Sequence, residues 1–275
     1  MERDAELSLP FMARPIRLVG RRNLYAKVNN CCSFFRSSIG KKWVVAVTGI
    51  IMVLFVIGHL IGNLQLFLGP GDAEHPAQLN VYAKFLQGLG SVLWLVRGVL
   101  ILAVVAHVVA TIKLTIENRA AKGGGIQFKN YSQARISSRT MIWSGAYILA
   151  FIIFHLLHYT IFVVHPEYRH LHDAHGLHDV YAMVLIGFSY AWISVFYIIG
   201  MILLCMHLAH GIESTFQTFG VQTQKLRPVF AVVGRGLAIL LAIGYISMPV
   251  AVLAGYGKEY REQAVAKVNA EKGGK

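Results

Sequence analysis

Charge is scarce in this sequence, and acidic charge is scarcest. Only 14% of its 275 residues are charged, against 56% that are hydrophobic, and the mean hydropathy is +0.55. There are 13 Asp and Glu residues against 26 Lys and Arg, which leaves a net charge of +13. This balance lies outside the usual composition of soluble globular domains and indicates a membrane protein.

Cysteine is almost absent as well. The three cysteines, Cys31, Cys32 and Cys205, form neither a CxxC nor a CxxCH motif. Their spacing argues against a thiolate metal site and against covalently attached haem. Any haem in this chain would therefore be of the non-covalent b type.

Long apolar segments are what the sequence does contain. A hydrocarbon core about 30 Å thick needs roughly 20 helical residues at about 1.5 Å each. Five segments are long enough, and they lack the alternation of barrel strands. We predict an all-α integral membrane bundle of five transmembrane helices, with spans near 43–67, 89–114, 141–164, 183–212 and 229–254.

Three regions follow from these spans. Residues 1–40 form a basic N-terminal segment, residues 41–256 the five-helix membrane domain, and residues 257–275 a charged C-terminal tail. We expect the tail to be frayed. No cleavable signal peptide is expected, because the chain before the first span has no apolar core of the required length.

Basic residues predict the orientation. Lys and Arg gather before the first span, between spans two and three, and between spans four and five. By the positive-inside rule the N-terminus is cytoplasmic and the C-terminus lies outside. The net positive charge then marks a face suited to anionic lipid or an acidic partner subunit, and does not indicate nucleic-acid binding.

Spans one and three share a motif. Residues 48–59, TGIIMVLFVIGH, and residues 144–155, SGAYILAFIIFH, each join a small hydroxyl residue and a glycine to a histidine at the same spacing. Spans two and four each place one further histidine late, at His107 and His207. The chain is thus predicted to contain two similar helical hairpins and a fifth helix.

The four intramembrane histidines fall at two depths. Counted from the cytoplasmic ends, His59 and His155 lie about 25 Å in and His107 and His207 about 9 Å in, at about 1.5 Å per residue. A single such histidine is explained by an interhelical hydrogen bond. Two matched pairs favour the axial ligands of two haem irons, one above the other. Small residues that suit a flat macrocycle lie nearby, at Gly49, Gly58, Gly62, Gly98, Gly145 and Gly200.

The stretches VIGHLIGN, VVAHVVATIKL, FIIFHLLHYTIF and MHLAHGIESTFQTFGVQTQKLRP carry a family resemblance. They resemble the haem-ligand regions of the cytochrome b membrane anchors of succinate dehydrogenase and fumarate reductase, of the single-chain, five-helix, dihaem kind. The resemblance runs from about Ser37 to Tyr256, and residues 1–36 fall outside it. It implies that His59 and His155 hold an outer haem b, and that His107 and His207 hold an inner one.

The resemblance also implies a place in a respiratory complex of a prokaryotic cytoplasmic membrane. A flavoprotein and an iron–sulfur subunit would dock on the basic cytoplasmic face. Electrons would pass between succinate or fumarate and a membrane quinone, with menaquinone favoured. The chain itself has no flavin fingerprint, so no catalytic dicarboxylate site is expected in it. One departure is Cys205, which occupies the position of a glutamate tied to proton movement in some members.

Other polar residues are candidates for supporting roles. Arg97 is costly in an apolar helix unless paired, and is expected either to meet a haem propionate or to snorkel. Gln87 and Ser91 are candidate quinone contacts or ordinary helix-start residues. His158 and His210 each follow a candidate ligand by three residues, about 60° around the helix. We expect them to be interfacial or propionate-facing.

Two other functions remain open. A membrane non-haem metal oxygenase or desaturase-like enzyme would use HLLH, HLAH and the His-rich loop 165–179 as metal boxes, and would need them clustered on one side. The simpler interpretation of that loop is a solvated surface segment. A histidine-lined cation or proton transporter is the other alternative, but no Asp, Glu or broken helix accompanies the histidines within the spans.

Overall fold

The computed structural model describes residues 33–121 and 136–273 and is all-α over these ranges. Five of its helical stretches are long and apolar enough to cross a membrane, as the composition predicted. They are α2 (Ser38–Asn63) continued by η1 (Leu64–Leu68), α4 (Ser91–Ala121), α5 (Ile136–Tyr159), α7 (Ala191–Thr218) and α8 (Arg227–Leu253). Cys31, Cys32 and most of the predicted N-terminal segment lie outside the described residues.

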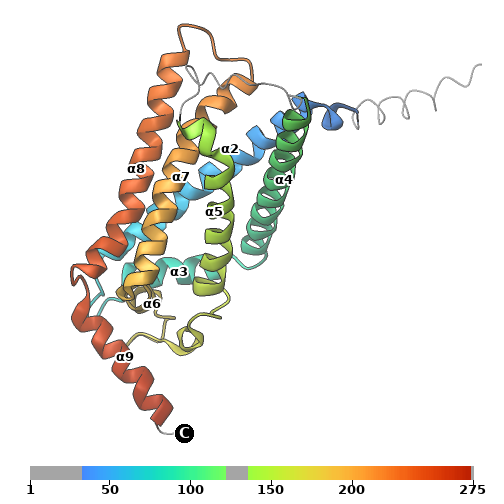
Figure 1. The fold of residues 1–275 in the computed structure, drawn as a ribbon. Helices are drawn as coiled ribbons and strands as arrows, with labels where there is room; N and C mark the ends of the chain where they lie inside the picture. Colours follow the sequence, from blue (N-terminus) through green and yellow to red (C-terminus); the bar gives the residue numbers. More distant parts are fainter. Residues whose placement is uncertain (1–32, 122–135, 274–275) are drawn as a thin grey trace, which may run out of the picture.

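The two ends of the bundle differ. At one end lie the start of α2, the end of α4 and the connection between α7 and α8, with Lys41, Arg119 and Arg227. We call this the basic end. At the other, which we call the loop end, lie the short elements α3 (Gln78–Gly88), η2 (Pro166–His170), α6 (Val180–Ser189) and α9 (Lys258–Gly273) (Figure 1).

Two predicted boundaries were wrong. The span expected at 183–212 is broken at Tyr190, whose extended backbone separates α6 from α7. Ser194 Oγ donates to the Phe188 carbonyl oxygen across this break, so the polar side chain replaces a lost helical bond. The third span ends at Tyr159 and not near 164, because the backbone turns there and Phe162 adopts a positive φ of 59°.

The C-terminal tail is a further correction, since it is helical and not frayed. Its helix α9 packs against α6, with Ala264 buried and Tyr260 stacked edge-on to Tyr181. Lys258 and Glu262 are exposed, whereas Lys267 lines a pocket on the same side as Tyr260. This helix therefore belongs to the folded loop end.

The long helices pack as two hairpins and an added helix. The closest packing joins α2 to α4, α5 to α7, and α7 to α8. Small residues allow close approach: a side chain at Gly244 of α8 would collide with Leu60 of α2. In the most apolar stretch of α4, only 6% of the residues are buried inside the protein, and the share in α5 is the same. Most of the surface of these two helices is therefore available to lipid or a partner.

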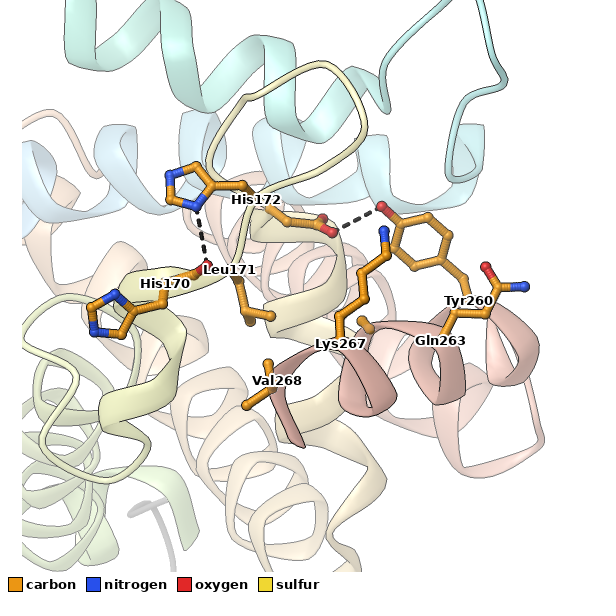
Figure 2. A pocket seen from close by; sticks show the side chains of 9 residues that line it. His170, Leu171, His172, Tyr260, Gln263, Lys267 and Val268 are labelled. Carbon is orange, nitrogen blue, oxygen red and sulfur yellow. Dashed lines mark hydrogen bonds between the residues drawn. The ribbon is translucent and has the colours of Figure 1, made fainter. Parts of the chain in front are cut away.

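Asn80 of α3 ties the loop end together. The residue is 1% exposed, and its Nδ2 donates to Asp173 Oδ2 and to Asp179 Oδ1 at 2.9 and 3.1 Å. Its Oδ1 accepts from the Tyr181 backbone N–H at 2.9 Å. Tyr260 Oη donates to the second Asp179 oxygen at 2.8 Å, at the edge of a pocket of about 100 Å³ between the His-rich loop and α9 (Figure 2).

Replacing Asn80 tests whether this network stabilises the fold. Asn80→Ala leaves the Asp179 carboxylate and the Tyr181 N–H short of partners in a buried site, so the free energy of unfolding should fall by about 3 kcal/mol. Thermal denaturation in detergent measures the change. Gln87→Ala, in the same helix but exposed, should have almost no effect, and equal shifts for the two variants would contradict the network's role.

Candidate functional site

The four intramembrane histidines meet in two pairs. The rings of His59 and His155 have centroids 5.8 Å apart, and those of His107 and His207 have centroids 6.4 Å apart. The first pair lies toward the loop end and the second toward the basic end, because α2 and α4 run in opposite directions. The structure thus brings together the residues that the depth count had paired.

Each pair joins the two hairpins. His59 lies on α2 and His155 on α5, while His107 lies on α4 and His207 on α7. Neither α2 with α5 nor α4 with α7 is among the closely packed helix pairs of the described chain. The imidazoles therefore meet between helices whose backbones are held apart by other contacts.

Hydroxyl groups orient the pair at the basic end. Thr48 Oγ1 lies 3.1 Å from His107 Nδ1, and Ser144 Oγ lies 3.2 Å from His207 Nδ1. The glycine after each hydroxyl residue faces the same ring: a Cβ at Gly145 would stand 3.6 Å from His207 Cε1. The repeated hydroxyl–glycine motif thus supports the histidine of the following span, while the histidine of the motif joins the other pair.

Aromatic rings surround the pair at the loop end. Phe55 stacks on His59 with centroids 5.2 Å apart, and Phe151 stacks on His155 at 5.9 Å. Tyr197 Oη lies 3.3 Å from His155 Nδ1, and so supplies the hydroxyl contact that Ser144 supplies to His207. The hydroxyl–glycine–histidine motif gave no indication that Tyr197 would contact His155.

The residues fit a metal bound between each pair. Two imidazoles on opposite sides of one metal, with metal–nitrogen bonds of about 2.0 Å, place their ring centres about 6 Å apart. Three of the four rings turn Nδ1 toward a hydroxyl, and such a contact leaves Nε2 for the metal. All four residues are half-buried, so protein does not cover the rings completely. The donor set is neutral nitrogen in an apolar bundle, which suits haem iron.

The remaining sequence candidates lie elsewhere. Arg97 stacks over the Trp94 ring at 5.0 Å and makes no ion pair with another described residue. Ser91 begins α4, whereas Gln87 belongs to the separate helix α3, which corrects its expected place at the start of span two. Both side chains are exposed, and the structure does not bring them to a histidine pair.

His158 was expected to be interfacial or propionate-facing, and its burial corrects the first of these alternatives. The residue is 0% exposed and its Nδ1 lies 3.2 Å from Tyr197 Oη. Two of the glycines expected to leave room for a macrocycle, Gly62 and Gly200, instead lie against aromatic rings. A Cβ at Gly62 would collide with the Tyr82 ring, and a Cβ at Gly200 with the Phe151 ring, so these glycines serve ring packing.

The His-rich loop 165–179 is only partly solvated. Exposed positions are His170, His172 and His175, but His165 and His178 are half-buried. Burial, with His172 nearby, lowers the pKa of His178, so its ring stays neutral at pH 7. In the described part of the chain, no three His, Cys, Asp or Glu side chains cluster closely enough to hold a metal ion.

Comparisons of this chain with protein-family models, with curated proteins and with solved structures found no match. The five-helix apolar bundle is that of a multi-pass membrane protein. The likeness to cytochrome b anchors remains a prediction that depends on the histidine motifs.

The hydroxyl contacts make a prediction about Ser144. Ser144→Ala leaves His207 Nδ1 without its hydroxyl neighbour in an apolar bundle, so stability in detergent should fall by about 1 to 2 kcal/mol. Ser247→Ala is the matched control, because that hydroxyl bonds the Gly244 carbonyl of its own helix. Thermal midpoints that fall equally in both variants would show that the contact to His207 has no special role.

Proposed function

We propose that this chain is the haem b-containing membrane anchor of a succinate:quinone oxidoreductase. It would relay electrons between an iron–sulfur subunit and a membrane quinone, in the direction of either succinate oxidation or fumarate reduction. The supporting observation is the arrangement of four histidines as two facing pairs at two levels. Neither helix pair that carries them, α2 with α5 or α4 with α7, is among the closely packed pairs of the described chain.

Each pair would hold one haem through the Nε2 atoms of its two rings. Bound haem supplies reversible one-electron transfer at iron, which no side chain of this bundle offers. The chain's own residues set its surroundings. Thr48, Ser144 and Tyr197 accept a hydrogen bond from Nδ1 and so hold the ring orientation and tautomer.

The two pairs would differ in polarity. The basic-end pair is supported by two aliphatic hydroxyls, whereas the loop-end pair lies among Phe55, Phe151 and Tyr197. Hydrogen bonding and dielectric tune haem potential, so the two haems should titrate separately.

The partner subunits would dock at the basic end. Among the described residues of this end, Lys41 pairs with Glu117 and Glu213 lies 4.0 Å from Arg227, while Arg36, Lys42 and Arg119 add further positive charge. Such a surface suits an acidic partner or anionic lipid. This assignment places the basic end in the cytoplasm and the loop end outside. The quinone would bind at a membrane boundary, with menaquinone as the favoured type. Gln87 and Ser91, which lie at the loop end and are exposed, remain candidate contacts from the sequence alone.

The desaturase-like alternative receives less support. It needs at least three ligands around one site, and the described histidines of HLLH, HLAH and the His-rich loop do not gather in this way. His158 of HLLH instead contacts Tyr197, beside the loop-end pair.

Spectra of the purified protein test the proposal. It should be red, with a reduced b-type spectrum and two haems per chain. His107→Ala and His155→Ala should each remove one haem, and a different one, because the two residues belong to different pairs. His175→Ala, in the exposed loop, should retain both. A colourless preparation, or loss of the same haem from both variants, would contradict the proposal.

Copurification tests the partner assignment separately. A flavoprotein and an iron–sulfur protein should accompany the full-length chain when the complex is extracted in mild detergent. Isolation of a dihaem protein that never associates with either would remove the succinate-linked role while leaving the haem sites in place.

A further inference from the structure

An open groove lies at the loop end, between helix α9 and the break that separates α6 from α7 (Figure 1). Its volume is about 520 Å³, which is within the range of about 300–1,000 Å³ that is usual for ligand sites. Helix α9 contributes Arg261, Glu262 and Val265 to its lining, and the break contributes Ser189 and Tyr190. The groove therefore joins charged, aromatic and apolar side chains from segments that are far apart in the sequence.

The start of α7 marks a membrane boundary beside this groove. Glu213 is the only Asp, Glu, Lys or Arg residue of α7. A hydrocarbon core takes roughly 20 helical residues, and counting these back from Glu213 reaches Ile193. Tyr190 and Trp192, which are 43% and 59% exposed, thus stand at the level of the lipid headgroups. Tyrosine and tryptophan are enriched at that level in membrane proteins.

An apolar stripe continues from the groove along α7. Its residues recur every three or four positions and so share one face of the helix. They are Trp192, Val195, Ile199 and Ile202, each 42–59% exposed, whereas Tyr197 on another face is only 6% exposed. The stripe begins two residues after Tyr190, and its composition suits the acyl chains of a lipid.

Arg261 has room for a further partner. Its side chain is 23% exposed, and its only ion pair among the described residues is with Glu262, whose Oε1 lies 3.8 Å from Nη2. That distance is too long for a hydrogen bond, and a guanidinium has five N–H donors to satisfy. Arginine binds phosphate through two parallel hydrogen bonds. Arg261 is thus suited to a phosphate group in the groove.

Glu262 places an opposite charge on the same wall of the groove. Its side chain is 59% exposed, and its second cation, Lys258 Nζ, lies 3.9 Å from Oε1. A phosphate bound to Arg261 would be repelled by this carboxylate unless the ligand also carried a positive group. In phosphoethanolamine, a two-carbon link joins the phosphate to an ammonium. That ammonium can donate charge-assisted hydrogen bonds to Glu262 while the phosphate binds Arg261.

We propose that the groove binds one phospholipid with a phosphoethanolamine headgroup, in the membrane leaflet at the loop end. Arg261 binds the phosphate and Glu262 the ammonium, while the acyl chains follow the apolar stripe of α7. Tyr190 packs against the glycerol, held by its stacking on His165 with ring centroids 5.2 Å apart. The lipid joins α9 to α7, which are not among the closely packed helix pairs of the described chain. No histidine pair takes part, so the site is independent of the proposed function.

Native mass spectrometry of the full-length chain, delipidated in detergent, tests the site. Phosphatidylethanolamine should saturate one site on the wild type, and Arg261→Ala should weaken its binding at least tenfold, because the phosphate loses its charged partner. Lys267→Ala is the matched control, since it removes the same charge from the same helix but does not line this groove. Equal affinities of the two variants would overturn the proposal. If Arg261→Ala does not fold, Glu262→Gln decides.

A comparison of headgroups tests the role of Glu262. The wild type should bind phosphatidylethanolamine at least tenfold more tightly than phosphatidylglycerol, which has no ammonium, and Glu262→Gln should remove most of that preference. Equal affinity of the wild type for the two lipids would show non-specific lipid contact only and overturn the proposal. Soluble phosphoethanolamine, which lacks acyl chains, should bind far more weakly than the lipid. Equally tight binding of this compound would assign the groove to a soluble phosphate ester and exclude the lipid.

Discussion

The arrangement of this protein depends on the cost of placing imidazole in an apolar bundle. An ionisable side chain between transmembrane helices needs a partner or a function. Here four histidines occur at two levels, and each faces another across the gap between two hairpins. The helices that carry them are held by other contacts, so the rings meet without close backbone packing.

The repeated hydroxyl–glycine–histidine motif contributes to both histidine pairs, which explains its spacing. In an antiparallel hairpin, residues at the start of one helix lie level with residues at the end of the next. Thr48 therefore reaches His107 and not the histidine of its own motif, and Ser144 reaches His207 in the same way. Each motif thus contributes a ligand candidate to one pair and a hydrogen-bond partner to the other, so both levels depend on the same helix register.

Much of this could be predicted from residue spacing. The five apolar spans needed only length and composition, and the pairing of histidines followed from counting residues. The polar surroundings could not be predicted in this way. Tyr197 lies 42 residues from His155, and its contact exists only because α5 packs against α7. The break at Tyr190 could not be predicted, because the sequence around it is largely apolar and hydropathy does not reveal that one residue has an extended backbone. The helix α9 was missed because its charge suggested fraying, while its packing contacts come from a few residues, among them Tyr260, Ala264 and Val268.

The loop end emerges as more than a set of connections. Asn80 and Asp179 hold α3, α6 and α9 together, and the neighbouring segment brings His165 and Tyr168 over the end of α5. This places buried titratable groups next to a pair of candidate haem ligands. A cryo-electron-microscopy map of the native protein tests the central claim most directly. The account predicts two planar densities, one between His59 and His155 and one between His107 and His207, whereas helices closed on each other with no density between the rings would contradict it.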